Sequence, residues 1–262
     1  MSHGIYSALS GAVAQQRNLQ MTANNVANAN TDGYKADKAV FAEFLTKEKS
    51  KLPPSTELRY AAVDEFWMDN SEGSIKFTGR KLDVSIHGDG YFTVKTPRGE
   101  RYTRAGSFVM DNNGILRTPE GHEVLSVQRD DIRLPGTRIQ IPLHAREVLI
   151  GQDGTVSVVD PDTTGNNNNQ IVGKLKLVHF ADQRNMEREG HTLFTTKDNT
   201  APLPVDPLTT VEQGYLEVSN VNAVHGMNEL IVVSRYFEAL EKVIETFRDI
   251  DDRTARDVGG RV

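Results

Sequence analysis

Apolar side chains recur at helical spacing near both ends of the chain. In the N-terminal segment, one helix face carries Ile5, Leu9, Ala12, Gln16, Leu19, Ala23, Val26 and Asn30. In the C-terminal segment, one face carries Leu230, Val233, Phe237, Leu240, Ile244 and Phe247. Alternating steps of three and four residues are typical of a helix that packs along another in coiled-coil fashion. We therefore predict helices over residues 2–30 and 224–252 that pair within one subunit, because isolated helices are marginally stable in water.

The C-terminal helix carries a second apolar stripe. Its positions are Val232, Tyr236, Ala239, Val243, Thr246 and Ile250. At about 100° per residue, this stripe lies roughly 110° around the helix axis from the first. One partner helix covers only one stripe, so the second predicts contact with a neighbouring subunit. The alternative is that the middle of the same chain covers it.

Between the two helical segments the pattern changes to that of β-structure. Leu82, Val84 and Ile86 alternate with their neighbours, and a Gly-containing turn separates them from the apolar run of residues 91–94. Further Gly-containing turn sequences follow at fairly regular spacing, which is typical of short antiparallel strands. The middle of the chain is therefore predicted to be β-rich.

These segments together predict an α+β fold in four parts. Residues 1–33 form the N-terminal helix, and residues 34–72 form an extended or hairpin connector that Pro53-Pro54 interrupts. Residues 73–214 form the β-rich middle domain, and residues 215–262 carry the C-terminal helix. The β-rich domain is thus inserted between two helices that form a helical assembly domain. Helical ends that can pair around such a domain favour an assembly subunit over an enzyme.

Composition excludes several classes of protein. The chain has 262 residues, 37% of them hydrophobic, and a mean hydropathy of -0.47, which suits a water-soluble fold. A formal charge of -6 gives no basic footprint, so we expect no nucleic-acid partner. The absence of cysteine excludes disulfides and thiolate metal sites. We find no membrane-spanning run and no cleavable signal peptide, so no membrane insertion is expected.

The chain shows no convincing catalytic or metal-binding motif. Its seven histidines lack the HExxH spacing of zinc proteases. Residues 160–165 begin like a calcium loop, but the twelfth position holds Ile171 in place of an acid. We therefore predict no catalytic, cofactor-binding or metal-binding residues. An enzyme or ligand-binding module built on the β domain, and a soluble export chaperone or regulator, are the competing classes.

Several motifs, in order along nearly the whole chain, resemble the flagellar rod and hook protein family. They cover residues 24–35, 82–94, 102–108, 213–222 and 235–238. The signature positions within them are Asn24, Asn25, Asn28, Thr31, Gly33, Asp83, Gly88, Gly90, Phe92, Ser219, Asn220 and Asn222.

The resemblance implies a structural subunit of the bacterial flagellar basal-body rod, the drive shaft that transmits torque from motor to hook. Residues 96–102, the short segment 200–207 and the end at residues 258–261 are most like the proximal-rod member, and the distal-rod protein is the alternative. Such a subunit polymerises helically through its terminal helices, with copies of itself and with other rod subunits. It reaches the periplasm-spanning rod through the flagellar type III export apparatus, without a cleaved signal peptide, and it needs no cofactor.

Overall fold

The computed structural model describes residues 2–46, 58–127, 138–159, 169–182, 185–197 and 200–259, which form two compact units. The helical unit comprises Met1–Ala27, Asp37–Asp69 and Asn222–Val262, and the β unit comprises Asn28–Ala36 and Asn70–Val221. The predicted α+β class is confirmed: a helix at each end of the chain and a β-rich middle. No helix among the described residues is both long and apolar enough to cross a membrane.

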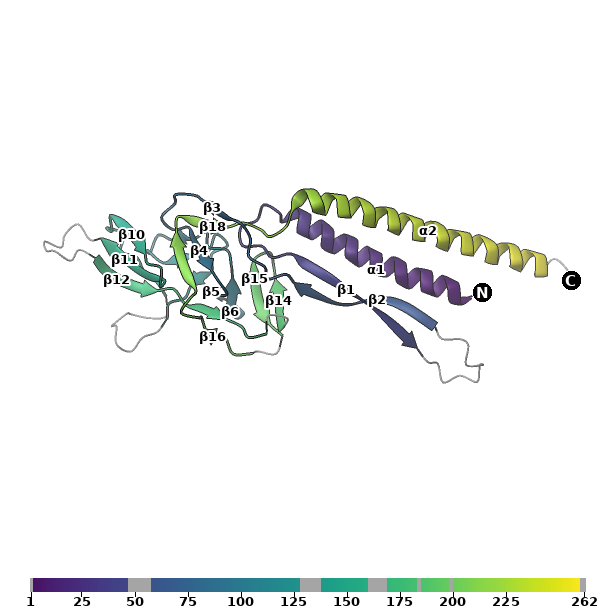
Figure 1. Cartoon of the computed structure of the whole chain (residues 1–262), viewed down its shortest axis with the longest axis horizontal. Coiled ribbons are helices and arrows are strands. Elements are labelled where there is room, and N and C mark those ends of the chain that lie inside the picture. Colours follow the sequence, from purple (N-terminus) through teal and green to yellow (C-terminus); the bar gives the residue numbers. More distant parts are fainter. Residues whose placement is uncertain are drawn as a thin grey trace. The chain divides into compact units, whose positions relative to one another are not determined.

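Two helices dominate the helical unit. α1 (Ser2–Ala27) and α2 (Ala223–Gly259) lie side by side and antiparallel, so both chain ends lie at the same end of the pair (Figure 1). A Cβ added at Gly11 would lie 3.8 Å from Leu240 Cδ1, and one at Gly226 would lie 2.7 Å from Val26 Cγ2. The two helices therefore approach closely at both levels, and the predicted pairing of the terminal helices is confirmed.

A β-hairpin completes the helical unit. β1 (Asp37–Thr46) pairs antiparallel with β2 (Leu58–Met68), with a register shift between Val40 and Phe41. α1 packs against β2 as well as against α2. The hairpin lies within the predicted connector, whose Pro53-Pro54 interruption falls outside the described residues.

The β unit is built from short antiparallel strands. Among its described residues, a nine-stranded sheet contains β5 (Tyr91–Thr96), β6 (Gly99–Thr103), β7 (Val109–Met110), β8 (Leu116–Arg117), β9 (Glu123–Val124), β13 (Leu177–His179), β14 (Met186–Glu189), β15 (Leu193–Thr196) and β16 (Leu203–Pro204). A three-stranded sheet contains β10 (Glu147–Ile150), β11 (Thr155–Val159) and β12 (Asn169–Lys174). Two further pairs join β17 (Thr210–Gln213) to β4 (Val84–His87) and β18 (Tyr215–Glu217) to β3 (Ile75–Phe77).

One apolar core underlies these sheets. Val84, Ile86, Phe92 and Phe108 are buried at its centre, with the two phenylalanine rings edge to face at 5.1 Å between centroids. Gly106 must be glycine, because an added Cβ would lie 1.6 Å from the carbonyl oxygen of Val84. Burial of these side chains provides the main stabilisation of the β unit.

The ends of the β unit differ from the predicted range of 73–214. Residues 28–36, 70–72 and 215–221 also belong to it, and α1 ends at Ala27, before the predicted helix end at residue 30. Asn28 begins a turn there, since its backbone oxygen accepts from Thr31 N at 3.1 Å. Tyr34 and Lys35 are then buried in the β unit. Segments from both sides of the β-rich middle therefore complete its fold.

The buried Tyr91 predicts a loss of stability at alkaline pH. Burial raises the pKa of Tyr91 from 10.0 to about 12, and its hydroxyl donates to Asn70 Oδ1 at 3.0 Å. The folded pKa exceeds the unfolded value, so this stability is complete below pH 10 and is lost as the pH rises toward 12. A shift of that size corresponds to about 3 kcal/mol. Urea unfolding between pH 8 and 12 should therefore show a smaller alkaline loss for Tyr91→Phe than for the natural chain.

A matched variant controls for the loss of a tyrosine hydroxyl as such. Tyr236 is exposed on α2, so Tyr236→Phe should keep the alkaline loss of the natural chain. If Tyr91→Phe also keeps the full loss, the titration of Tyr91 is not its cause.

Candidate assembly surface

The predicted pairing face of α2 is largely covered in the single chain. Val233 is buried, and the other five positions of this first stripe are half-buried. On α1, Ala12 is buried and Ile5, Leu19 and Val26 are half-buried. These positions lie on the covered sides of the two helices.

Two predicted pairing residues of α1 lie elsewhere. Leu9 and Ala23 are exposed, whereas Ala14 and Thr22 are buried. The covered face of α1 is thus rotated from the predicted one, because α1 packs against β2 as well as α2. Leu9 and Ala23 lie outside the covered face of α1, and their pairing with α2 stays a prediction.

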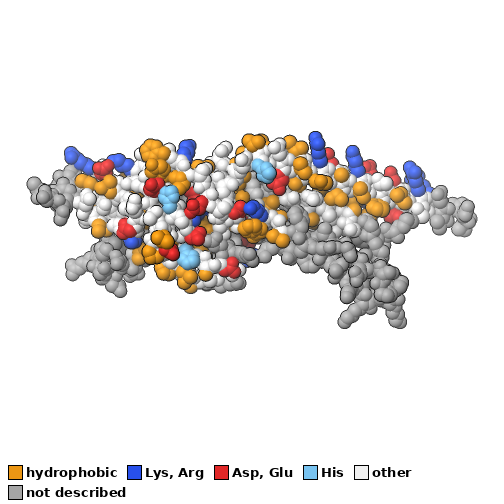
Figure 2. Space-filling view, viewed as in Figure 1, with side chains coloured by type: hydrophobic (Ala, Val, Ile, Leu, Met, Phe, Trp, Pro, Cys, Tyr) orange, Lys and Arg blue, Asp and Glu red, His pale blue; other side chains and the backbone are white. Residues whose placement is uncertain are grey.

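The second stripe of α2 is exposed in the single chain. Val232, Tyr236, Val243 and Ile250 are between 43% and 61% exposed, and Ala239 is exposed as well. Figure 2 shows hydrophobic side chains at the surface along the helical unit. A row of apolar side chains left open to water on a helix already packed on another side is suited to contact with a partner.

The signature residues do not lie on this stripe, and several of them join distant segments of the β unit. Gly33 has a φ of +71°, and an added Cβ would lie 2.2 Å from Ala105 N. Asn220 Oδ1 accepts from Ala36 N at 2.7 Å, and its Nδ2 donates to the backbone oxygen of Ser71 at 3.2 Å. We call the joined segments, residues 28–36, 70–73, 104–106 and 214–221, the junction.

Other signature residues shape turns and helix ends. Ser219 Oγ accepts from Val221 N, Asn28 Oδ1 accepts from the Thr31 hydroxyl, and Asn222 Oδ1 caps α2 by accepting from His225 N at 3.0 Å. In the helical unit, Asn25 exchanges two hydrogen bonds with the backbone of Asp37, while Asn24 is exposed on α1.

The central signature residues support the core. Phe92 is fully buried, and Gly88 has a φ of +90°. A Cβ at Gly90 would lie 3.1 Å from Val205 Cγ1. Asp83 is buried, its carboxylate lies 3.6 Å from Arg80 Nε, and its backbone oxygen accepts from Gly214 N at 2.8 Å. The roles of these signature residues are therefore structural.

A buried ion network forms the centre of the junction. Lys35 Nζ lies 2.6 Å from Glu217 Oε1, and Arg104 Nη1 lies 3.2 Å from Glu217 Oε2. The three side chains are at most 2% exposed. Lys35 Nζ also donates to the backbone oxygen of Ser71 at 2.7 Å, and Arg104 Nη2 donates to that of Gly88 at 2.8 Å. One carboxylate thus holds two cations from separate parts of the chain.

Burial and charge act in opposite directions on Lys35. Desolvation lowers the pKa of Lys35, and the adjacent Glu217 carboxylate counteracts part of that decrease. Arg188 adds a further positive charge to this part of the junction, with its guanidinium 4.1 Å from the centroid of the Tyr34 ring. Glu217 is therefore the neutralising partner without which Lys35 and Arg104 would carry buried, unpaired charge.

The sequence alone did not indicate that Lys35, Arg104 and Glu217 interact. Lys35 and Arg104 lie in the family motifs, yet nothing local links them to Glu217, which is 182 residues after Lys35. A charged residue inside an otherwise apolar or small-residue motif is a signal that could have pointed to this network.

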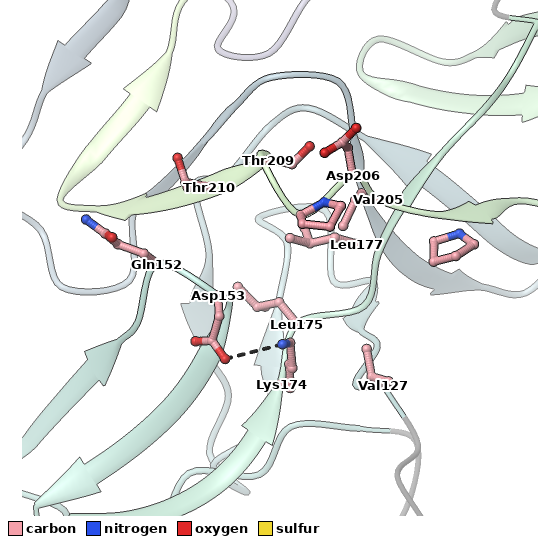
Figure 3. A pocket seen from close by; sticks show the side chains of 12 residues that line it. Val127, Gln152, Asp153, Lys174, Leu175, Leu177, Val205, Asp206, Thr209 and Thr210 are labelled. Carbon is pink, nitrogen blue, oxygen red and sulfur yellow. Dashed lines mark hydrogen bonds and ion pairs between the residues drawn. The ribbon is translucent and has the colours of Figure 1, made fainter.

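The surface of the β unit also has an open hollow (Figure 3). Its lining includes Gln152, Leu175, Thr209 and an ion pair between Lys174 and Asp153 at 3.3 Å. Hydrogen bonds from Thr155, together with Lys174, hold the pKa of Asp153 at about 2, so this carboxylate is charged and not poised for proton transfer near neutral pH. In the described part of the chain, no three His, Asp or Glu side chains are grouped to hold a metal ion.

The ion network predicts a large effect of removing its single anion. Glu217→Gln leaves Lys35 and Arg104 buried without a neutralising partner, which should lower the free energy of unfolding by about 3–5 kcal/mol. Glu147→Gln is the matched control, because its ion pair with Lys81 is roughly half exposed on both sides. It should change stability by less than about 1 kcal/mol. Equal urea midpoints for the two variants would contradict a stabilising role for the network.

Comparison with known proteins matches these regions. The family model "Flagella basal body rod protein" covers residues 5–35, "Flagellar hook protein FlgE/F/G D1 domain" covers residues 85–158, and "Flagellar basal body rod FlgEFG protein C-terminal" covers residues 212–257. The first match covers most of α1 and the start of the junction, and the last covers the end of β17, all of β18 and most of α2.

Curated relatives match along their whole length. The chain is 32% identical to the flagellar basal-body rod protein FlgG of Bacillus subtilis, over 95% of this chain and 97% of the relative. It is 36% identical to FlgF of Escherichia coli, over 98% and 97%, and 30% identical to FlgF of Mesorhizobium japonicum, over 100% of both. The chain therefore belongs to the flagellar basal-body rod protein family, and it is a structural subunit of the bacterial flagellar rod rather than an enzyme.

Proposed function

We propose that the chain is a proximal-rod subunit that polymerises helically with copies of itself and with other rod subunits, and so transmits torque from motor to hook. The observation that supports this most directly is the exposed second stripe of α2, defined by Val232, Tyr236, Ala239, Val243 and Ile250. The first stripe of α2, by contrast, packs against α1 within the same chain.

The energetics of this stripe suit subunit addition. Each large apolar side chain, once fully buried, contributes about 1.5–3 kcal/mol. Several such side chains in one row can offset the loss of rotational and translational freedom on association. A helical polymer forms when a patch on one subunit meets a different patch on the next, so that the contact never closes on itself. The contact is thus expected to be heterologous.

The proximal position rests on a short segment before the C-terminal motif. Residues 200–207 include β16, which pairs with β13. The family resemblance implies a longer insert at this point in the distal-rod protein. The alternative is the distal-rod protein of the same family, because relatives named FlgF and FlgG match with similar identity. Complementation of two strains, each lacking one of these relatives, distinguishes the positions by which strain recovers swimming.

The route to the rod follows from the same proposal. The chain is exported unfolded through the flagellar type III apparatus, without a cleaved signal peptide, and it assembles in the part of the rod that spans the periplasm. Mass measurement of the subunit recovered from basal bodies would reveal a cleaved leader, which would contradict this route.

Val243→Asp tests the proposed subunit contact. Val243 is exposed in the single chain, so an aspartate there leaves the subunit folded but must be buried on assembly, at a cost of several kcal/mol. Cells that carry this variant should secrete the subunit normally and swim poorly or not at all. Leu240→Asp should differ, because Leu240 is half-buried against α1 and its replacement disrupts the helix pair itself.

Lys242→Asp is the matched control for Val243→Asp. It introduces the same carboxylate one position earlier on α2, where the natural side chain is exposed and charged, and it makes a larger change in charge. Swimming should persist with Lys242→Asp. Normal swimming with Val243→Asp would mean that the second stripe is not a subunit contact.

A further inference from the structure

The junction joins the segment that follows α1 to the segment that precedes α2. Gly33 N donates to the backbone oxygen of Glu217 at 2.7 Å. Asn220 Oδ1 accepts from Ala36 N at 2.7 Å, and this bond links residues 184 positions apart in the chain. α1 ends at Ala27, shortly before Gly33, and α2 starts shortly after Asn220. The junction therefore leaves only short lengths of chain between its hydrogen bonds and the two helices.

The helix pair is tightly packed at the ends that lie nearest to the junction along the chain. A Cβ added at Gly226 would lie 4.0 Å from Val26 Cβ and 2.7 Å from Val26 Cγ2. Asn222 caps the start of α2, and Asn25 fixes the end of α1 through two hydrogen bonds with the backbone of Asp37. These helix ends are therefore anchored by side-chain hydrogen bonds as well as by packing.

Burial decreases from these anchored ends toward the ends of the chain. On α2, Gly226 and Val233 are buried, and none of the described side chains after Val233 is. On α1, Ala12, Ala14 and Thr22 are buried, and none of the described side chains before Ala12 is. Segments with few buried contacts open most easily. The helix pair is therefore expected to be firmest near Gly226.

The entropy of chain closure favours the same end of the pair. Without the junction, contact between Val26 and Gly226 closes a loop of about 200 residues, whereas the path through the Gly33–Glu217 bond has about 16 residues. The effective concentration of one segment at the other falls roughly as the −3/2 power of the loop length, so the junction raises it roughly fortyfold. This gain matters because isolated helices are marginally stable in water.

We infer that the junction nucleates the helix pair, which then closes from Val26 and Gly226 toward the two ends of the chain. Closing of the β unit comes first, because its last strand supplies Glu217 to the junction. The inference concerns the single chain and does not depend on the second stripe being a subunit contact. Together with the proposed function, it makes closing of the β unit a condition for assembly.

A disulfide between the two helices tests this inference, because it can take the place of the junction. The natural chain contains no cysteine, and the 4.0 Å between the two Cβ positions suits a disulfide for Val26→Cys with Gly226→Cys. This pair is introduced into the natural chain and into Glu217→Gln. Both are compared as free subunits at a urea concentration that unfolds the β unit of Glu217→Gln alone. Hydrogen exchange of the α1 and α2 amides is followed by mass spectrometry.

The junction should control protection of the helices in the reduced chains. With Glu217 present, the amides should be protected, most strongly near residues 26 and 226. With Glu217→Gln, they should exchange at least about tenfold faster, in keeping with the loss of the short path. Oxidation should restore protection in the Glu217→Gln chain, while near-ultraviolet circular dichroism still shows an unfolded β unit. Glu147→Gln with the same two cysteines is the matched control and should stay protected when reduced.

Four results would overturn the inference. Equal protection in the reduced Glu217→Gln chain would mean that the helices pair without the junction. Helices that stay unprotected in the oxidised Glu217→Gln chain would mean that joining their ends is not what the junction provides. Stronger protection at the ends of the chain would contradict the direction of closure. Unprotected helices in the reduced chain with Glu217 would show that a closed β unit does not nucleate the pair.

Discussion

The buried network of Lys35, Arg104 and Glu217 is the constraint on which the β unit depends. Each of these charges, buried alone, would cost several kcal/mol, and one carboxylate neutralises both cations. The three residues come from the segment after α1, from the middle of the β unit and from its last strand. The β unit therefore closes only when all three segments are in place, and its last strand is as necessary as its apolar core.

The chain buries an apolar core, as soluble proteins generally do, but it departs from the usual distribution of charge and apolar surface in two places. Three charges are enclosed in the junction, whereas α2 exposes large apolar side chains on two faces. The enclosed charges specify one arrangement of the β unit, and the exposed apolar side chains require cover from outside the chain. The exposed apolar side chains suit a subunit of the flagellar rod, where contact with other subunits can cover them.

The sequence predicts the helices, their pairing and the β-rich middle, because long apolar periodicities and Gly-containing turns are local signals. Leu9 and Ala23 are exposed although helical spacing assigned them to the pairing face, since spacing alone cannot reveal that β2 shares the covering of α1 with α2. It also could not predict that Asp83 and Ser85 are buried in an alternating strand region, because both faces there are covered. The pairing of Lys35 with Glu217 carries no local signal, although both residues lie in family motifs.

Comparison of two truncated chains tests the central claim, that the last strand completes the β unit. A chain ending at Val221 retains every segment of the β unit, whereas one ending at Thr209 lacks β17, β18 and Glu217. The account predicts cooperative urea unfolding, followed by near-ultraviolet circular dichroism, for the first chain and no cooperative transition for the second. Cooperative unfolding of both chains at the same urea concentration would contradict it.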